Sequence, residues 1–174
     1  MVDCVILPAR VEDAPALAAL HAESWRSAYR GMLPDTYLDG PIVDERLEFW
    51  QRRMVELDPT CSRVLKAVME SQLAGFACIV LDVDPIWGTR LENLHVRPNM
   101  KGQRIGGRLF DHALEWAKAA RPDRPMHLWV LEQNLPARRF YEQRAGRVAD
   151  SKMIEVVPSV HVGEVRYVWD ATRP

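Results

Sequence analysis

Apolar residues recur every three or four positions in several segments of the chain, a spacing that places them on one face of a helix. The predicted helices run from Asp13 to Gly31, from about Val43 to Glu56, from Ile105 to the residue before Arg121, and from Pro136 to Ala145. Gly146 is expected to cap the last of them in a left-handed conformation.

Between these helices lie short apolar runs bounded by turn residues, which predict strands. They cover Val2 to Pro8, Val64 to Met69, Leu73 to Leu81, Arg90 to Val96, His127 to Glu132, about Arg147 to Val156, and Gly163 to Trp169. Glu70, Ser71 and Gln72 separate the second run from the third, so those two strands are expected to form a hairpin. The order β-α-α-β-β-β-α-β-α-β-β predicts an α/β (α+β) fold, a mixed sheet flanked by helices.

The composition limits the class of protein without naming a function. At 174 residues with 48% hydrophobic content, the chain is expected to form a single domain over residues 1–174. The formal net charge of -1 favours neither nucleic acid nor an anionic membrane, and no apolar run approaches the roughly 18 residues of a membrane span. Cysteines without Cys-x-x-Cys spacing and histidines without a ligand pair indicate a cytoplasmic protein with no metal.

The segment from Val96 to Gly107 has a clear chemical character. A strand ends, a proline prevents further pairing, and a glycine-rich turn leads into a helix, so several backbone N–H groups converge on one point. The positive end of the helix dipole, with Lys101, Arg104 and Arg108 nearby, favours an anion such as a diphosphate. Such turns also occur where a helix simply packs on a sheet, and spacing alone leaves both interpretations open. The absence of Gly-x-Gly-x-x-Gly and of Gly-Lys-Ser/Thr argues against a Rossmann or P-loop site.

Three stretches of the chain resemble the GNAT superfamily of acyl-CoA-dependent N-acetyltransferases. Leu91 to Pro98 is similar to the family's central strand, and Lys101 to Gly106 is similar to its Gln/Arg-x-x-Gly-x-Gly/Ala pyrophosphate loop. The second cofactor segment of the family is similar to Leu128 to Asn134 together with Ala137, Phe140 and Tyr141. The resemblance implies a mostly antiparallel central sheet, in which two parallel strands splay apart and leave a slot for acetyl-CoA.

Most of the candidate site residues come from this resemblance. Acetyl-CoA is expected to bind at Leu94, His95, Val96, Lys101, Gly102, Gln103, Arg104, Ile105, Gly106, Gly107, Arg108, Asn134, Ala137, Phe140 and Tyr141. The backbone of Leu94 and Val96 would pair with the pantetheine amides, in the manner of an added strand. A small-molecule, amino-acid or peptide amine is expected beside Trp25, Tyr29 and Trp87, although Trp25 also belongs to an apolar helical stripe.

Arg104 departs from the family pattern, because that position is usually a glycine. A residue with a Cβ disfavours positive φ, so Arg104 is expected to avoid the left-handed region. Its N–H would still face the diphosphate, while its guanidinium turns toward solvent or the ribose phosphate. Lys101, where the family prefers Gln or Arg, keeps a donor and a charge.

Attack on a thioester requires a neutral amine, and a primary alkylamine has a pKa of about 10.4, so some group must accept a proton. The resemblance makes Glu92 the candidate base, with His95 as the alternative. Strict alternation along the strand would place Glu92 on the face shared by Leu94 and Val96. His95 would then lie on the opposite face. An ordinary salt-bridged carboxylate is the other interpretation of Glu92.

Tyr141 is the candidate donor to the departing thiolate. A phenol with a pKa of about 10 is a weaker acid than a thiol at about 8.5, so hydrogen bonding precedes or replaces full proton transfer. The N–H of Val96 is the candidate donor to the carbonyl oxygen, and Asn134 is expected to anchor pantetheine or to cap its helix. Because Cys78 sits in an apolar strand and Cys4 and Cys61 have no histidine partner, direct transfer is expected.

A second function fits the same residues, a module that binds acyl-CoA without transferring the acyl group. The presence of Tyr141, Asn134 and Glu92 favours the enzyme over this module. A homodimer formed through the last two strands is compatible with the sequence.

Overall fold

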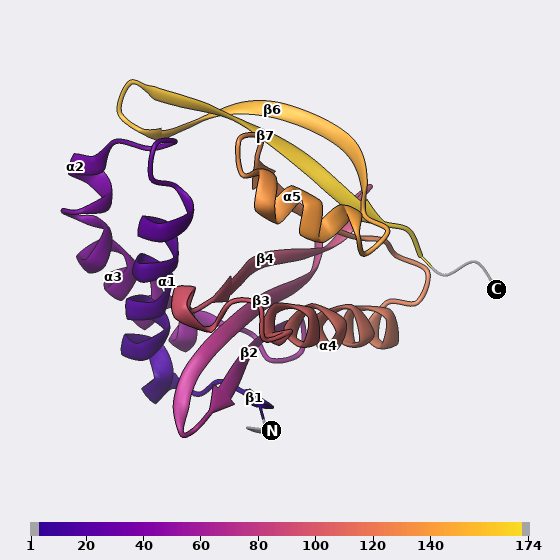
Figure 1. The fold of residues 1–174 in the computed structure, drawn as a ribbon. Helices are drawn as coiled ribbons and strands as arrows, with labels where there is room; N and C mark the ends of the chain where they lie inside the picture. Colours follow the sequence, from indigo (N-terminus) through magenta and orange to yellow (C-terminus); the bar gives the residue numbers. More distant parts are fainter. Residues whose placement is uncertain (1–3, 172–174) are drawn as a thin grey trace.

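The computed structural model describes residues 4–171, in which a seven-stranded sheet carries helices on both faces (Figure 1). The strands are β1 (Cys4–Pro8), β2 (Ser62–Met69), β3 (Gln72–Asp84), β4 (Gly88–Val96), β5 (Met126–Leu131), β6 (Arg147–Val157) and β7 (Val160–Trp169). Their order across the sheet is β1-β2-β3-β4-β5-β7-β6. Within residues 4–171, the β4–β5 pair is parallel and the other pairs are antiparallel.

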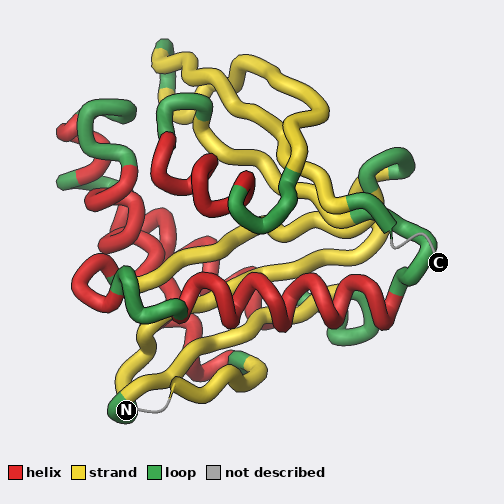
Figure 2. The backbone as a smooth tube through the Cα atoms, turned by 45° about the vertical axis from the view of Figure 1, so that its right-hand side comes forward, coloured by secondary structure: helices red, strands yellow, loops and turns green. Residues whose placement is uncertain are grey.

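The helices form a layer on each side of the sheet. They are α1 (Ala14–Ala28), α2 (Asp35–Leu38), α3 (Ile42–Glu56), α4 (Ile105–Ala120) and α5 (Leu135–Glu142), with 3-10 turns at Val11–Asp13 and Pro98–Met100. α1 and α3 pack on one face of the sheet, whereas α4 and α5 share the hydrophobic core on the other face. Figure 2 shows α4 running along the strands beneath α5. This arrangement confirms the predicted fold class.

Alternation along the strands decides which residues meet which helices. In the paired strands β2 and β3, Leu65 and Ala77 lie opposite one another and pack in the core with α4. Their neighbours Val64 and Cys78 also lie opposite one another, and they pack with α1 and α3. Since successive side chains of a strand point to opposite faces, these strands become apolar on both sides and lie buried between helices.

The central strands β4 and β5 separate along their length. They pair only through Thr89 with Met126 and Arg90 with His127, at the beginning of each strand. Beyond these pairs the strands diverge toward their C-terminal ends, which confirms the predicted splay. The backbone of β4 that would face β5 is therefore left without a strand partner in the described structure.

Several element boundaries differ from the prediction. The hairpin turn between β2 and β3 holds only two residues, Glu70 and Ser71, with φ of 49° and 62°. Such a turn needs positive φ at both positions, because its twist must match that of the strands. The short helix α2 was not predicted, and the first two residues of the predicted N-terminal strand, Val2 and Asp3, lie outside the described residues.

The end of α5 corrects the expected role of Gly146. The left-handed residue there is Ala145, with φ of 60°, and not the glycine that follows it. Gly146 instead allows the backbone to lie close to Trp169, because a Cβ at this position would lie 2.6 Å from Cζ2 of that ring. The glycine therefore lets β6 begin directly against the core.

Neither a membrane-spanning helix nor a cluster of metal ligands occurs among the described residues. None of the helices there is both long enough and apolar enough to cross a bilayer. No group of three or more potential metal ligands occurs among residues 4–171.

Candidate active site

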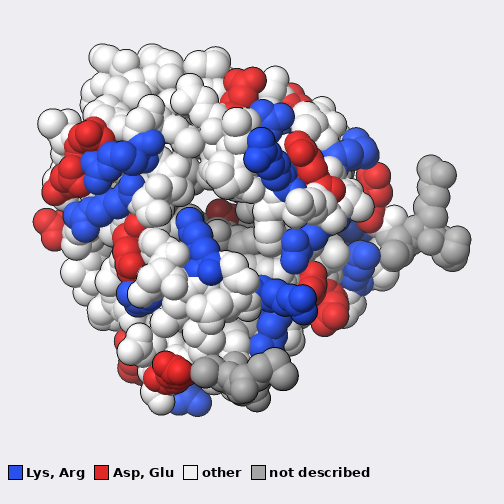
Figure 3. Space-filling view, in the orientation of Figure 1, with Lys and Arg blue, Asp and Glu red and all other residues white. Residues whose placement is uncertain are grey.

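A cavity of about 630 Å³ opens between the diverging ends of β4 and β5. The predicted site residues that line it are Trp25, Tyr29, Glu92, Leu94, His95, Val96, Lys101, Gly102, Arg104, Ile105, Gly106, Gly107, Asn134, Ala137, Phe140 and Tyr141. Figure 3 shows a hollow on the side of α4 and α5, with basic side chains near its rim and acidic atoms at its bottom. The structure thus brings most of the two predicted segments together around one space.

The backbone of β4 presents unpaired groups to this cavity. The N–H of Arg97 donates to the carbonyl oxygen of Ala74 in β3, with an N···O distance of 2.8 Å. Because successive backbone groups of a strand point to opposite edges, the N–H and carbonyl groups of Val96 and Leu94 face the gap instead. An extended ligand with amide groups can therefore pair with this edge of β4.

The N-terminus of α4 is built to attract an anion. The first hydrogen bond of this helix runs from the N–H of Arg108 to the carbonyl oxygen of Arg104, at 3.1 Å. The N–H groups of Ile105, Gly106 and Gly107 have no backbone acceptor among the described residues, and no side chain caps the helix. These donors and the positive end of the helix dipole point to the same space.

Gly106 leaves room for a ligand at this helix end. A Cβ at Gly106 would lie 3.4 Å from Cγ2 of Val96 and 3.7 Å from the ring of Phe140, which are ordinary contacts. Packing inside the protein therefore does not require a glycine here. Its missing side chain keeps the helix backbone accessible from the cavity, as a bound diphosphate requires.

Arg104 corrects the expectation that it would avoid positive φ. Its φ is 61° and its ψ is 8°, so it occupies the left-handed region at the N-cap of α4. The loop before it also contains Gly102 at φ 83°, where glycine bears no such penalty. The turn into α4 therefore overrides the preference of Arg104, at a cost of roughly 1–2 kcal/mol.

Arg144 is a functional candidate that the sequence analysis missed. Its guanidinium carbon lies 4.0 Å from the ring centroid of Phe140, and its Nη2 stands where a Cβ of Gly107 would be. The Nε of Arg144 is buried without a hydrogen-bond partner in the described structure. With Lys101 and Arg104 it adds positive charge beside the start of α4, a donor set that suits a phosphorylated ligand.

Two of the residues predicted to bind the cofactor lie outside the cavity. Gln103 and Arg108 are exposed and do not line it.

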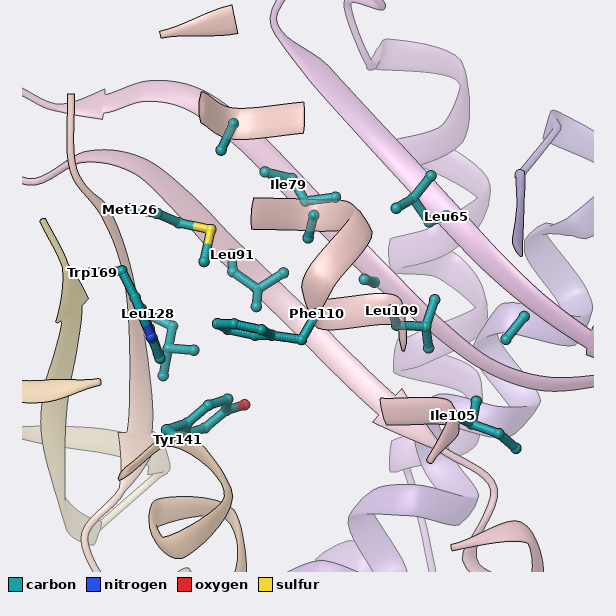
Figure 4. Packing of buried hydrophobic residues seen from close by; sticks show 14 of the residues in the cluster. Leu65, Ile79, Leu91, Ile105, Leu109, Phe110, Met126, Leu128, Tyr141 and Trp169 are labelled. Atoms are coloured by element: carbon teal, nitrogen blue, oxygen red, sulfur yellow. The ribbon is translucent and has the colours of Figure 1, made fainter. Parts of the chain in front are cut away.

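Tyr141 of α5 is held by an aromatic cluster. Its ring centroid lies 5.8 Å from that of Trp169 and 6.4 Å from that of Phe110, and Figure 4 shows its hydroxyl pointing away from Trp169. No hydrogen bond to this hydroxyl occurs among the described residues, although the side chain lines the cavity. Burial raises the pKa of Tyr141, and the neighbouring phenol of Tyr29 adds to the increase. The group therefore stays a protonated donor that is free to bind a ligand atom.

Asn134 caps the helix that carries Tyr141. Its side-chain oxygen accepts a hydrogen bond from the N–H of Ala137 at 3.3 Å, and Pro136 occupies the first turn of α5. This helix cap is one of the two roles expected for Asn134 from the sequence. The side chain also lines the cavity, so the cap and a ligand contact are compatible.

A β-bulge corrects the predicted face of Glu92. Cys78 of β3 pairs with Asn93, but the next residue, Ile79, pairs with Leu91, so Glu92 is the extra residue. The bulge shifts the alternation and turns the carboxylate away from the core beneath α4. Glu92 therefore lies on the α1 and α3 side, the side of His95, and not with Leu94 and Val96.

The carboxylate of Glu92 already has a strong partner. Its Oε2 forms an ion pair with Nη2 of Arg53 in α3, and the thiol of Cys78 lies 3.9 Å away. This ion pair matches the second interpretation of Glu92, although the side chain also lines the cavity. The carboxylate oxygen that would accept a proton from an amine is therefore already in contact with a guanidinium.

His95 is a weak base in this environment. A hydrogen bond of 2.9 Å joins its Nδ1 to Oγ of Ser24. Burial, together with the positive charges of Lys101 and Arg46, lowers the pKa of His95 to about 3. The ring is therefore neutral at physiological pH and accepts a proton poorly.

The aromatic residues expected at the acceptor separate into two groups. Trp25 and Tyr29 of α1 line the cavity and pack edge to face, with ring centroids 5.1 Å apart. Trp87 does not line it and instead lies over the guanidinium of Arg166 at 5.3 Å. This placement corrects the expectation for the loop before β4. That loop lies at the paired end of β4 and β5, whereas the cavity opens at their splayed end.

Glu164 and Trp129 line the cavity and were also missed. They lie on β7 and β5, on the sheet face opposite α4 and α5. No local motif marks them, since each is a polar or half-buried position in an otherwise apolar strand. Only the alternation of the strands could have indicated that they share a face.

Comparisons with known proteins agree on one family. The model of the Acetyltransferase (GNAT) family matches residues 19–146. The chain is 30% identical over 162 residues to the protein named Probable N-acetyltransferase Rv2775 of Mycobacterium tuberculosis, covering 91% of this chain and 90% of that protein.

Solved structures share the fold at lower sequence identity. The PaiA N-acetyltransferase of Thermoplasma acidophilum, crystallised in complex with coenzyme A, superposes with a TM-score of 0.75 at 21% identity, over 94% of this chain and 98% of that one. An N-acetyltransferase of Staphylococcus aureus superposes with a TM-score of 0.70 at 16% identity, over 98% and 99% of the two chains.

Proposed function

We propose, since this chain belongs to the GNAT family of acetyltransferases, that it transfers an acetyl group from acetyl-CoA to a primary amine by direct attack. Membership in this family makes the chain an acyltransferase. That acetyl-CoA is the donor and that a primary amine is the acceptor is what we propose. The observation that carries the proposal is the cavity between β4 and β5, which joins the uncapped N-terminus of α4 to the hydroxyl of Tyr141.

Acetyl-CoA fits the groups around this cavity, and when bound it supplies the acetyl group as a thioester. The N–H groups of Ile105 to Gly107 and the side chains of Lys101, Arg104 and Arg144 are the proposed diphosphate contacts. The free edge of β4 at Leu94 and Val96 is the proposed contact for the pantetheine amides. Asn134, Ala137 and Phe140 form the opposite wall. The coenzyme A complex of the Thermoplasma protein supports the same donor here.

The acceptor amine must lose a proton before it attacks. Glu92 is the proposed proton acceptor, because its carboxylate lines the cavity on the side of α1. In this structure Nη2 of Arg53 already contacts this carboxylate, so the amine would have to share it with that guanidinium. His95, with a pKa lowered to about 3 mainly by burial, is the weaker alternative, and it serves better as a hydrogen-bonding group.

Two donors are proposed to stabilise the charge that develops during transfer. The N–H of Val96 faces the gap and is placed to donate to the carbonyl oxygen. The hydroxyl of Tyr141 is the proposed donor to the departing sulfur. Because burial raises the pKa of Tyr141, this phenol stabilises a thiolate by hydrogen bonding more readily than by giving up its proton.

Release of free thiol from acetyl-CoA, measured against a panel of primary amines, tests this proposal. The panel should hold alkylamines, arylalkylamines, amino acids and short peptides with free amino termini. The expected result is turnover with at least one class, together with a rise in the thermal midpoint on addition of coenzyme A. The absence of both effects would contradict the proposal.

The ion pair between Glu92 and Arg53 favours a second candidate, a module that binds acyl-CoA without transferring the acyl group. Such a protein needs no carboxylate that is free to accept a proton, and this carboxylate is held by Arg53. Thermal stabilisation by coenzyme A without thiol release across the whole panel would identify this module.

Location and assembly are part of the same proposal. The free thiols of Cys4, Cys61 and Cys78 support a reducing, cytoplasmic environment. A homodimer through the late strands is supported by the position of β6, an 11-residue strand at the edge of the sheet. Its outer edge leaves backbone groups unpaired, as strand-to-strand association requires. Light scattering after size-exclusion chromatography tests the dimer.

A further inference from the structure

The charged side chains that line the cavity are separated by sign. Lys101, Arg104 and Arg144 lie on the side of α4 and α5, and Glu92 and Glu164 lie on the opposite side, among the described residues. Figure 3, seen from the side of α4 and α5, shows basic side chains near the rim of the hollow and acidic atoms at its bottom, which agrees with this separation. The two ends therefore favour ligand groups of opposite charge.

Alternation along β7 explains why Glu164 faces the acidic end. Val165 and Tyr167 pack in the core with α4 and α5, so Glu164 points to the other face of the sheet. Trp129 of β5 points the same way, because its neighbours Leu128 and Val130 belong to that same core. A carboxylate and an indole ring thus lie together beside the gap, on the side of Trp25 and Tyr29.

Of the two carboxylates, Glu164 is the one available to a ligand. Glu92 is held by Arg53 in an ion pair. The one cation within ion-pair distance of Glu164, among residues 4–171, is Lys152, whose Nζ lies 3.7 Å from Oε2. That separation is longer than a hydrogen bond, and the Lys152 side chain is 46% exposed on the edge strand β6. An incoming cation can displace it at little cost.

The ammonium group of Lys152 lies between Trp129 and Glu164. Its Nζ lies 4.3 Å from the ring centroid of Trp129 while it approaches the carboxylate of Glu164. A primary ammonium thus rests between an indole face and a carboxylate, two groups that attract cations. Arg166 also approaches Trp129, at 4.4 Å, but it is held by Asp84 at 3.0 Å.

This cation site is close to the proposed chemistry. Burial raises the pKa of Tyr29 to about 12, and the charge of Glu164 contributes to the rise. The phenol of Tyr29 in turn raises the pKa of Tyr141. Glu164, Tyr29 and Tyr141 all line the same cavity, and Tyr29 is the phenol that is close to both of the others.

We propose that Glu164 and Trp129 bind the ammonium group of the acceptor, and that the acceptor is a primary amine with an apolar body and no adjacent carboxylate. This inference rests on the proposed acetyl transfer and narrows its acceptor. Trp25, Ala28 and Leu33, together with Ile154 and Val156, supply the apolar walls. A carboxylate beside the amine would meet Glu92 and Glu164. The cations near these side chains in the described structure are already engaged: Arg53 pairs with Glu92, Lys152 approaches Glu164, and Arg46 stacks on the ring of Trp25.

Matched pairs of acceptors test the substrate class. 2-Phenylethylamine and phenylalanine share a body and differ by a carboxylate, as do tryptamine and tryptophan. Thiol release from acetyl-CoA is expected to give a kcat/KM about 10-fold or more higher for each amine than for its amino acid, the effect of one unfavourable charge contact. Equal or higher values for the amino acids would overturn the inference and leave the proposed function intact.

Variants of the site test the residues. Glu164→Gln keeps the shape of the side chain and removes its charge, so the KM for the amine should rise about 10-fold while the KM for acetyl-CoA stays unchanged. Lys152→Gln removes the competing ammonium and should lower the KM for the amine; an unchanged or higher KM would contradict the cation site. Glu115→Gln, on the exposed face of α4, is the matched control.

The outcomes separate the two proposals. If Glu164→Gln leaves the amine KM unchanged while the wild type turns over amines, Glu164 is not the binding group and acetyl transfer still stands. If no amine or amino acid releases thiol although coenzyme A raises the thermal midpoint, both acetyl transfer and this inference fail.

Discussion

The two helices that follow the splayed strands begin in opposite ways. α5 starts with Asn134, whose side chain accepts a hydrogen bond from the N–H of Ala137, and with Pro136, which has no N–H to satisfy. α4 starts with Arg104 in the left-handed region, without a side-chain cap, and leaves the N–H groups of Ile105 to Gly107 free. One helix thus satisfies its own end, and the other leaves its donors to a ligand.

The two helix starts correspond to two different proposed roles. An uncapped helix end beside a cavity binds an anion through its backbone, where glycine is an advantage. A capped helix is stable by itself and can hold one side chain in place, here Tyr141 within its aromatic cluster. Substitutions at the two starts should therefore affect different quantities, namely ligand affinity at α4, and stability and turnover at α5.

The largest effect is expected from Gly106→Trp, which fills the space in front of the free N–H groups of α4. The affinity for coenzyme A should fall at least about 100-fold by isothermal titration calorimetry. Leu135→Trp is the matched control, because Leu135 is the first residue of α5 and is 51% exposed. Unchanged affinity in Gly106→Trp would remove the start of α4 from the site. Gly106→Ala, whose Cβ makes only ordinary contacts, provides a milder variant that keeps the fold.

Tyr141→Phe should lower kcat by about 100-fold, the scale of losing a donor to the leaving group, with the KM for acetyl-CoA unchanged. The thermal midpoint should change little, because the hydroxyl has no partner among the described residues. Tyr167→Phe is the matched phenol, whose hydroxyl donates to Glu142 and accepts from Nε of Arg138. It should lower the free energy of unfolding by about 1 kcal/mol and leave kcat unchanged. A reversed pattern would assign Tyr141 to structure.

Asn134→Ala removes the cap of α5 and should lower the free energy of unfolding by about 1 kcal/mol in urea denaturation. Arg104→Ala, at the equivalent position of α4, should show no such loss, because Arg104 makes no capping hydrogen bond. Equal losses in both variants would mean that the two helix starts do not differ in the way described.

Arg104→Gly should give the smallest effect, a rise in the free energy of unfolding of about 0.5 kcal/mol. Glycine bears no penalty at φ 61°, although part of the gain is offset by its larger freedom in the unfolded chain. Ala145→Gly, at φ 60° beyond α5, should give a similar gain. Arg104→Lys keeps the Cβ and should give none. Destabilisation by Arg104→Gly would show that the left-handed backbone is not strained.

The parts predicted from the sequence are those that short-range patterns encode. The order of strands and helices followed from apolar spacing, and only the short helix α2 was missed among the helices described. The two turns into α4 and α5 were predicted from local glycine, proline and asparagine signals. These predictions succeeded because the forces that set them act within a few residues of the chain.

Other features failed because they depend on contacts between distant segments. The face of Glu92 was predicted from strict alternation, but its register with β3 contains a bulge. Trp87 was assigned to the acceptor side, but β4 pairs with β5 at that end. Glu164 was not considered, because its proposed role depends on which strands lie beside β7.

Local spacing and backbone preference were enough to predict most of the elements, their order, the family resemblance and the two loops that we propose to contact the ligand. Long-range packing sets where β4 and β5 separate, which carboxylate is paired with Arg53, and which one remains available beside Trp129. Charge pairing and cavity shape arise from residues far apart in the chain, and no local pattern fixes the distances between them.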